Sequence, residues 1–159
     1  MNPEIVNCKE KKLVGLRRVV SMTVYDAAPL WQEFMPHLSR ILGRTDSSTV
    51  SLSKYPRGYF ENFDPGTEFE KWAAVEVSGI GELPEGLESL TVSSGEYAVF
   101  HYIGSSSDRS IFERIYCTWL PNSIYRLDNR PHFEILGEKY KNAATDSEEN
   151  IYIPVILRD

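Results

Sequence analysis

The same order of predicted elements occurs twice along these 159 residues, and this repeat constrains the fold more than any single motif. Residues 13–21 (LVGLRRVVS) predict a strand, residues 26–42 a helix, and residues 49–55 and 67–78 two further strands. The Gly- and Pro-rich residues 79–86 predict a linker. After it the pattern restarts with the strand segments LESLTV and GEYAVFHYIG. A helix follows, which begins at Ser107 or Asp108 and stops at Pro121, and the chain ends with the strands HFEIL and NIYIPVI.

Two copies of a β-α-β-β module predict a single α+β domain with pseudo-twofold symmetry. The domain covers residues 1–159, with halves at about 10–78 and 86–157. We expect a strongly twisted, mostly antiparallel sheet, with two helices on one face and a ligand cleft on the other. A chain of this length can bury a core without disulfides or metals.

Each predicted helix carries apolar residues at helical spacing. In the first helix, Pro36 interrupts an apolar face that includes Trp31 and Phe34, but the spaced apolar residues outweigh one helix breaker. In the second helix, a continuous apolar stripe ends at Trp119 and Leu120. Both helices are therefore expected to pack against the sheet.

The acidic composition limits the classes of partner. A net charge of -6 and a pI near 5.1 argue against direct binding to duplex DNA, because Lys and Arg supply most of the affinity for phosphates. A negative field instead attracts cationic ligands. Cys8 and Cys117 are expected to be free thiols, and no His or Cys spacing predicts a metal or another cofactor. No signal peptide or membrane-spanning stretch is evident, so we expect a cytoplasmic protein.

One carboxylate stands out in the strand HFEIL. Strand alternation places Glu134 and Leu136 on one face, together with His132, and Phe133 and Ile135 on the other. A carboxylate beside apolar and aromatic side chains can bind a lipophilic cation, although such a residue taken alone more often faces water. The same alternation directs four aromatic side chains toward the groove: Tyr55, Trp72, Tyr102 and Tyr152.

Several motifs resemble one known family in combination. The segments TWLPNSIY and RPHFEILGEKY resemble the C-terminal half of the GyrI-like, AraC-type effector-binding domain, and LPEGL followed by GEYAVFHYIG resembles its central portion. The resemblance implies a duplicated domain with a cleft between its halves, as in stand-alone integron-cassette proteins that bind cationic drugs. It also implies that Glu134 lies at the floor of the pocket and pairs with lipophilic cations. Trp119 is a further pocket candidate, although its position on the apolar stripe more often indicates the core.

The sequence and the resemblance together leave three functions open, of which the second and third are implied by the resemblance. The first is a binding module for hydrophobic, cationic small molecules, which senses or sequesters them. Only about a dozen residues precede the first predicted strand, so we expect transcription regulation to require a partner chain. The second is a hydrolase of strained electrophilic toxins, in which Glu134 acts on water with Tyr102 or Trp119. The third is a modulator of DNA gyrase. Open edge strands leave a homo-oligomer possible.

Overall fold

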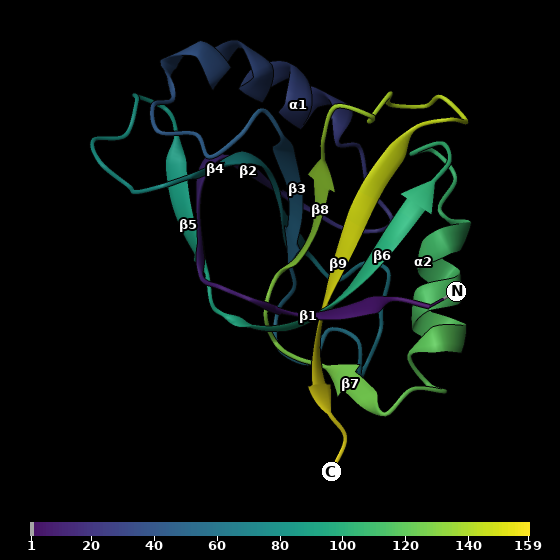
Figure 1. Ribbon diagram of the computed structural model, residues 1–159. Coiled ribbons are helices and arrows are strands. Elements are labelled where there is room, and N and C mark those ends of the chain that lie inside the picture. The colour runs from purple at the N-terminus through teal and green to yellow at the C-terminus, as the bar shows by residue number, and fades with distance from the viewer. Residues whose placement is uncertain (1) are drawn as a thin grey trace.

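The computed structural model describes residues 2–159 as an α+β fold of nine strands and two short helical regions (Figure 1). The first half contains β1 (Glu4–Cys8), β2 (Lys11–Val20), α1 (Ala28–Phe34), η1 (Met35–Arg40), β3 (Thr49–Lys54) and β4 (Phe69–Val77). The second half contains β5 (Glu88–Val92), β6 (Gly95–Ile103), α2 (Ser110–Arg114), η2 (Ile115–Trp119), β7 (Tyr125–Leu127), β8 (His132–Leu136) and β9 (Glu148–Leu157). All the strand pairs are antiparallel.

The strand order confirms the predicted pseudo-twofold arrangement. The sheet runs β1-β6-β9-β8-β3-β4-β2-β5, with β7 paired to β9 beside this path. Outward from the central pair of β3 and β8, the first half continues β4, β2 and the second half continues β9, β6. The two halves therefore meet where β3 pairs with β8, and Ser51 lies opposite Glu134 in that register.

The outermost strands are exchanged between the halves. Strand β1 belongs to the first half in sequence but pairs with β6 of the second half, and β5 belongs to the second half but pairs with β2 of the first. The sequence did not predict β1, and the prediction that the first strand begins near residue 13 is wrong. Its five residues gain their strand conformation from pairing with a segment about 90 positions away, as in Glu4 opposite Val99.

Both helices are shorter or less regular than predicted. The sequence predicts a helix over residues 26–42. In the structure the α-helix ends at Phe34, and the chain continues as the 3₁₀ helix η1. Pro36 explains this change, because it has no N–H to donate to the Gln32 carbonyl. The second helix changes from α2 to a single π-helical turn, in which the Leu120 N–H donates to the Ile115 carbonyl at 2.9 Å.

The sheet buries side chains on both faces. Helix α1 covers the apolar side chains of β2 and β4, including Val14 and Val75, and α2 covers those of β6 and β9, including Phe100 and Ile153 (Figure 1). The opposite face forms a third core cluster, which consists of Leu13, Val50, Leu52, Trp72, Ala74, Val92, Tyr97 and Phe133. Between the two helices, the central strands β3 and β8 carry polar residues. No helix of residues 2–159 is both long and apolar enough to cross a membrane.

Candidate functional site

A cleft lies over the junction of the two halves, on the face that carries the helices. Its floor includes Ser51, Ser53, His132 and Glu134, which alternate with core residues along β3 and β8. The prediction of a cleft on the face opposite the helices is therefore wrong. The reason is that α1 and α2 each cover only one half of the sheet, while the opposite face is filled by its own apolar cluster.

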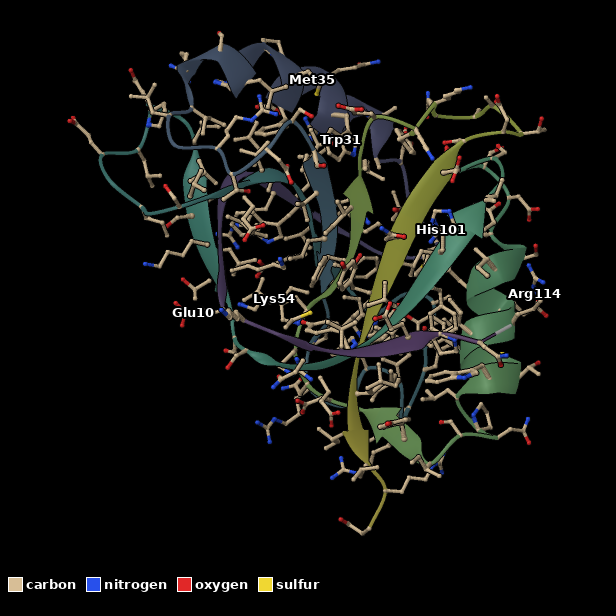
Figure 2. All side chains as sticks on the ribbon, in the orientation of Figure 1. Glu10, Trp31, Met35, Lys54, His101 and Arg114 are labelled. Carbon is tan, nitrogen blue, oxygen red and sulfur yellow. The ribbon has the colours of Figure 1, made fainter. Side chains whose placement is uncertain are left out.

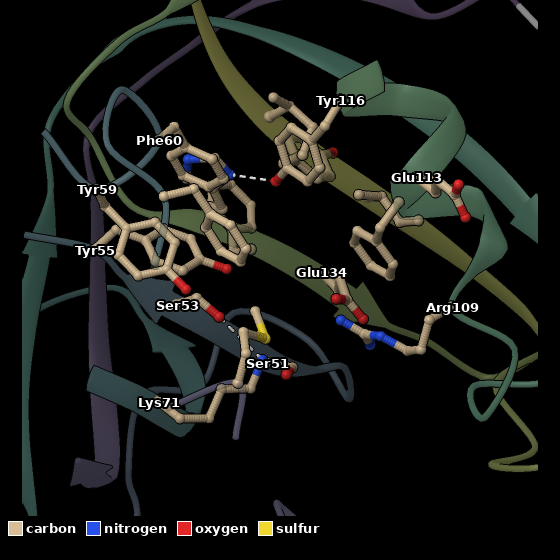
Figure 3. Close-up of a pocket in the computed structure, with 18 of the residues that line it drawn as sticks. Ser51, Ser53, Tyr55, Tyr59, Phe60, Lys71, Arg109, Glu113, Tyr116 and Glu134 are labelled. Atoms are coloured by element: carbon tan, nitrogen blue, oxygen red, sulfur yellow. Dashed lines mark hydrogen bonds between the residues drawn. The ribbon is translucent and has the colours of Figure 1, made fainter. Parts of the chain in front are cut away.

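One part of the cleft, the aromatic lobe, is a cavity of about 530 Å³. The loop that follows β3 folds over it and contributes Tyr59, Phe60 and Phe63, while η2 contributes Tyr116 (Figure 3). Tyr55 contacts three of these neighbouring rings, with centroid distances of 4.6 Å to Tyr59, 4.9 Å to Phe60 and 4.9 Å to His132. The packed rings form a preorganised apolar wall.

A partly buried hydrogen bond stabilises the back of this wall. The Tyr116 hydroxyl and His132 Nδ1 are 2.7 Å apart, and the Phe60 ring stacks on both residues. Burial, assisted by the charges of Lys71 and Arg130, lowers the pKa of His132 to about 3. The neutral ring can therefore accept a hydrogen bond from the Tyr116 hydroxyl, and His132 acts as a fixed structural group at neutral pH.

The second part, the α1 lobe, is a cavity of about 690 Å³ beneath α1. Trp31 and Met35 line it from the helical region (Figure 2), and Leu136 and Tyr140 line it from the second half. Four residues line both lobes and mark the junction of the cleft: Ser51, Lys71, Arg109 and Glu134. A ligand at the junction can therefore extend into either lobe.

Charged side chains of both signs meet at this junction. Arg109 and Glu134 point toward one another across it (Figure 3). Lys71 is only 4% exposed, and its Nζ donates a hydrogen bond to Ser53 Oγ at 3.2 Å. The junction thus offers a half-buried carboxylate and two cationic groups beside an aromatic surface.

A second carboxylate lies close behind Glu134. Glu149 on β9 is 7% exposed, and Ile151, two residues further along the same strand, lies directly opposite Glu134. Burial, followed by the charge of Glu134, raises the pKa of Glu149 to about 8. At neutral pH, Glu149 therefore holds a proton that a nearby positive charge would tend to displace.

The structure brings only some of the predicted site residues to the cleft. Glu134 and Tyr55 line the aromatic lobe, and Glu134 and Leu136 line the α1 lobe. Tyr152 also belongs to the lining of the aromatic lobe, but its ring stacks on Phe133 at 4.6 Å, in the cluster on the opposite face.

The other three predicted residues lie in the core. Trp72 is 3% exposed within the cluster opposite the helices, since both faces of β4 are buried and alternation could not identify the cleft face. Tyr102 lies on the helix-covered face, but beneath α2, where its hydroxyl donates to the Ser105 carbonyl at 2.8 Å. Trp119 packs edge-on against Phe100 in the same cluster.

Several cleft residues were not predicted. The loop aromatics Tyr59, Phe60 and Phe63 lie between the predicted strands at 49–55 and 67–78, where no site residue is predicted, although three aromatic residues within five positions signal a buried or binding role. Strand alternation also gives a signal for Lys71, which is in register with Ser53 on the polar face of β3. No group of three or more His, Cys, Asp or Glu side chains in residues 2–159 is arranged to hold a metal ion.

Comparison with solved structures shows the same fold. An integron cassette protein from Vibrio cholerae shares 18% identity with a TM-score of 0.65, over 98% of this chain and 96% of that chain. The protein SAV2435, solved bound to tetraphenylphosphonium, shares 15% identity with a TM-score of 0.64, over 98% and 94% of the two chains. EcmrR, solved in a DNA complex, shares 13% identity with a TM-score of 0.70, and this chain covers 58% of it.

Sequence comparison identifies the family directly. No curated protein sequence is significantly similar to the chain. The model of the GyrI-like small molecule binding domain, however, matches residues 1–156, which is nearly the whole length. Together with the duplicated sheet and the cleft at its centre, this match shows that the chain belongs to the GyrI-like small-molecule-binding domain family.

Proposed function

We propose that this protein binds hydrophobic, cationic small molecules in the cleft, with Glu134 as their counter-ion. One observation carries the proposal: the Glu134 carboxylate lies at the junction of the two lobes, directly beside an aromatic wall. A lipophilic cation is complementary to this combination, because its charge meets the carboxylate while its apolar body displaces water from the rings.

The size and composition of the cleft support this ligand class. A cavity of about 530 Å³ is within the range of drug-sized ligand sites. Each aromatic ring near a cation contributes on the order of 0.5–2 kcal/mol, so several rings and one carboxylate can give micromolar affinity. Flat ring faces impose few directional requirements, which favours binding of many ligand shapes. The tetraphenylphosphonium complex of SAV2435 provides a precedent on the same fold.

In the cell, we propose that the domain senses or sequesters its ligand in the cytoplasm. The free thiols of Cys8 and Cys117 agree with a reducing compartment. The acidic charge of -6 disfavours direct binding to DNA, so regulation of transcription would proceed through a partner protein. The likeness to part of EcmrR, which was solved with DNA, supports a link between this fold and regulation.

A hydrolase is the second candidate function. It is favoured by the pairing of Glu134 with the buried Glu149, because a carboxyl group that holds a proton at neutral pH can act as an acid beside a second carboxylate. Tyr102 and Trp119, the assisting residues expected from the sequence, lie in the core instead. Turnover of a strained electrophile that is lost in Glu134→Gln would establish this function, and absence of turnover would exclude it for that substrate.

We expect tetraphenylphosphonium to bind the protein saturably with a micromolar Kd. Trp31 lines the α1 lobe, so its fluorescence should report on the occupied cleft. A titration followed by tryptophan emission, with correction for inner-filter effects, measures the affinity. A linear, unsaturable signal up to millimolar ligand would contradict the proposal.

We also expect the affinity for tetraphenylphosphonium to rise with pH. The pKa of Glu149 is raised to about 8, so an increase from pH 6.5 to 9 converts it from neutral to negatively charged beside Glu134. Its other charged neighbours are Arg109 and Lys71, while Tyr102 and Tyr140 have pKa values raised above 10 and stay neutral. Because the ligand itself does not titrate, a gain of about three- to tenfold is expected.

Isothermal titration calorimetry at both pH values measures this gain in the wild type and in Glu149→Gln. The variant cannot ionise at position 149, so its affinity should be nearly constant over the same range. An equal rise in both proteins would show that another group is responsible.

A further inference from the structure

Two positively charged groups at the cleft junction have no carboxylate partner. No Asp or Glu oxygen of residues 2–159 lies within 4.0 Å of Lys71 Nζ or of the Arg109 guanidinium. Both residues nevertheless line both lobes of the cleft. A site that served only a cation would gain nothing from two fixed positive charges, because like charges repel across a partly desolvated cavity.

Lys71 is the more deeply buried of the two groups and therefore has the greater need for a compensating partner. It comes from the central strand β4, and only 4% of the residue is exposed. Its ammonium has three donors, and residues 2–159 supply one hydrogen-bond acceptor, Ser53 Oγ. A buried charge is costly unless other groups compensate it, so the remaining donors point to an acceptor that is not part of the chain.

Arg109 supplies a second contact point. Its Cζ lies 4.2 Å from the Phe112 ring centroid and 5.8 Å from that of Tyr25. The Lys71 Nζ lies 5.9 Å from the same Tyr25 ring. Both cations therefore lie near the same aromatic ring. The planar Arg109 guanidinium also stacks on Phe112, which leaves its N–H donors available to bind an oxyanion.

The nearby carboxylates do not prevent Lys71 and Arg109 from binding an anion. Glu134 is one carboxylate against two cations, the neighbouring Glu149 holds a proton at neutral pH, and Glu113 lies on the exposed surface of α2. In Figure 3, the Glu113 carboxylate points away from the junction. One cationic contact therefore remains available even when Glu134 offsets the other.

We propose that the natural ligand is amphoteric: an aromatic body occupies the aromatic lobe, a cationic group faces Glu134, and a carboxylate-type anionic group binds between Lys71 and Arg109. This proposal rests on the proposed function, since it concerns the same cleft. For full affinity it adds a requirement for a negatively charged group, which a simple lipophilic cation such as tetraphenylphosphonium lacks.

A matched pair of dyes tests this requirement. Rhodamine B carries a cationic ring system and a free carboxylate, and its ethyl ester carries the same ring system with the carboxylate blocked. We expect the wild type to bind rhodamine B about tenfold more tightly than the ester, measured by fluorescence anisotropy. Lys71→Met should weaken rhodamine B binding and leave ester binding equal or stronger, because it removes both an anion contact and a repulsion.

Opposite changes for the two dyes distinguish anion recognition from a structural role, since a damaged cleft would lose both. Arg109→Gln provides a second test at an exposed position whose side chain is not needed in the core, and it should also reduce the preference for rhodamine B. Equal or tighter binding of the ester by the wild type would overturn the amphoteric ligand but leave the proposed function intact. Failure of both dyes to bind would contradict the two proposals together.

Discussion

Trp72→Ala is expected to lower the free energy of unfolding by about 3–5 kcal/mol, the usual cost of removing a fully buried large aromatic side chain. Trp72 is 3% exposed and packs in one cluster with Leu13, Leu52 and Phe133. Its indole N–H also donates to Glu70 Oε1 at 3.0 Å. Since domains of this kind are stable by only about 5–15 kcal/mol, the substitution removes a large share of the total stability.

Urea denaturation followed by circular dichroism measures this loss. Trp31→Ala is a matched control, because Trp31 is half-buried at the α1 lobe and its removal should cost clearly less. If Trp72 were a wall of the cleft, its replacement would reduce ligand affinity and leave the stability close to that of the wild type. That outcome would contradict the assignment of Trp72 to the core.

Glu134→Gln is expected to weaken tetraphenylphosphonium binding by about 10- to 100-fold, or roughly 1.4–2.8 kcal/mol. The substitution preserves the shape of the side chain and removes the negative charge that faces the ligand. It also leaves Lys71 and Arg109 without their nearest negative charge at the junction, which increases the repulsion of a cation.

Glu138→Gln makes the same chemical change at an exposed position outside both lobes, so it should leave the affinity unchanged. Paired titrations of the two variants measure the difference. Comparable affinities in Glu134→Gln and the wild type would remove Glu134 from the role of counter-ion, even if the cleft still binds the ligand.

The duplicated fold was predictable because its signals are local. Strand alternation and helical spacing recur on both sides of the turn-rich residues 79–86, and those patterns depend only on nearby residues. The exchange of β1 and β5 between the halves was not predictable in the same way. It depends on pairing between distant segments, and the five residues of β1 carry no strong pattern of their own.

The site was predictable where one strand face is polar. Glu134 and Tyr55 follow the alternation of β8 and β3 and reach the cleft. On β4, by contrast, nearly every residue is buried, so alternation gave Trp72 no distinguishing signal. For Tyr102, alternation identified a face but not the helix that covers it. Which face a helix occupies is a tertiary property that strand periodicity does not contain.

Mapping of backbone amide chemical shifts during a tetraphenylphosphonium titration tests the central claim most directly, because it locates the ligand independently of its charge preference. We predict saturable shifts concentrated around the cleft junction, at residues such as Ser51, Lys71, Arg109 and Glu134. Shifts confined to the opposite face or to the edge strands β1 and β5, with none at this junction, would contradict the assignment of the binding site.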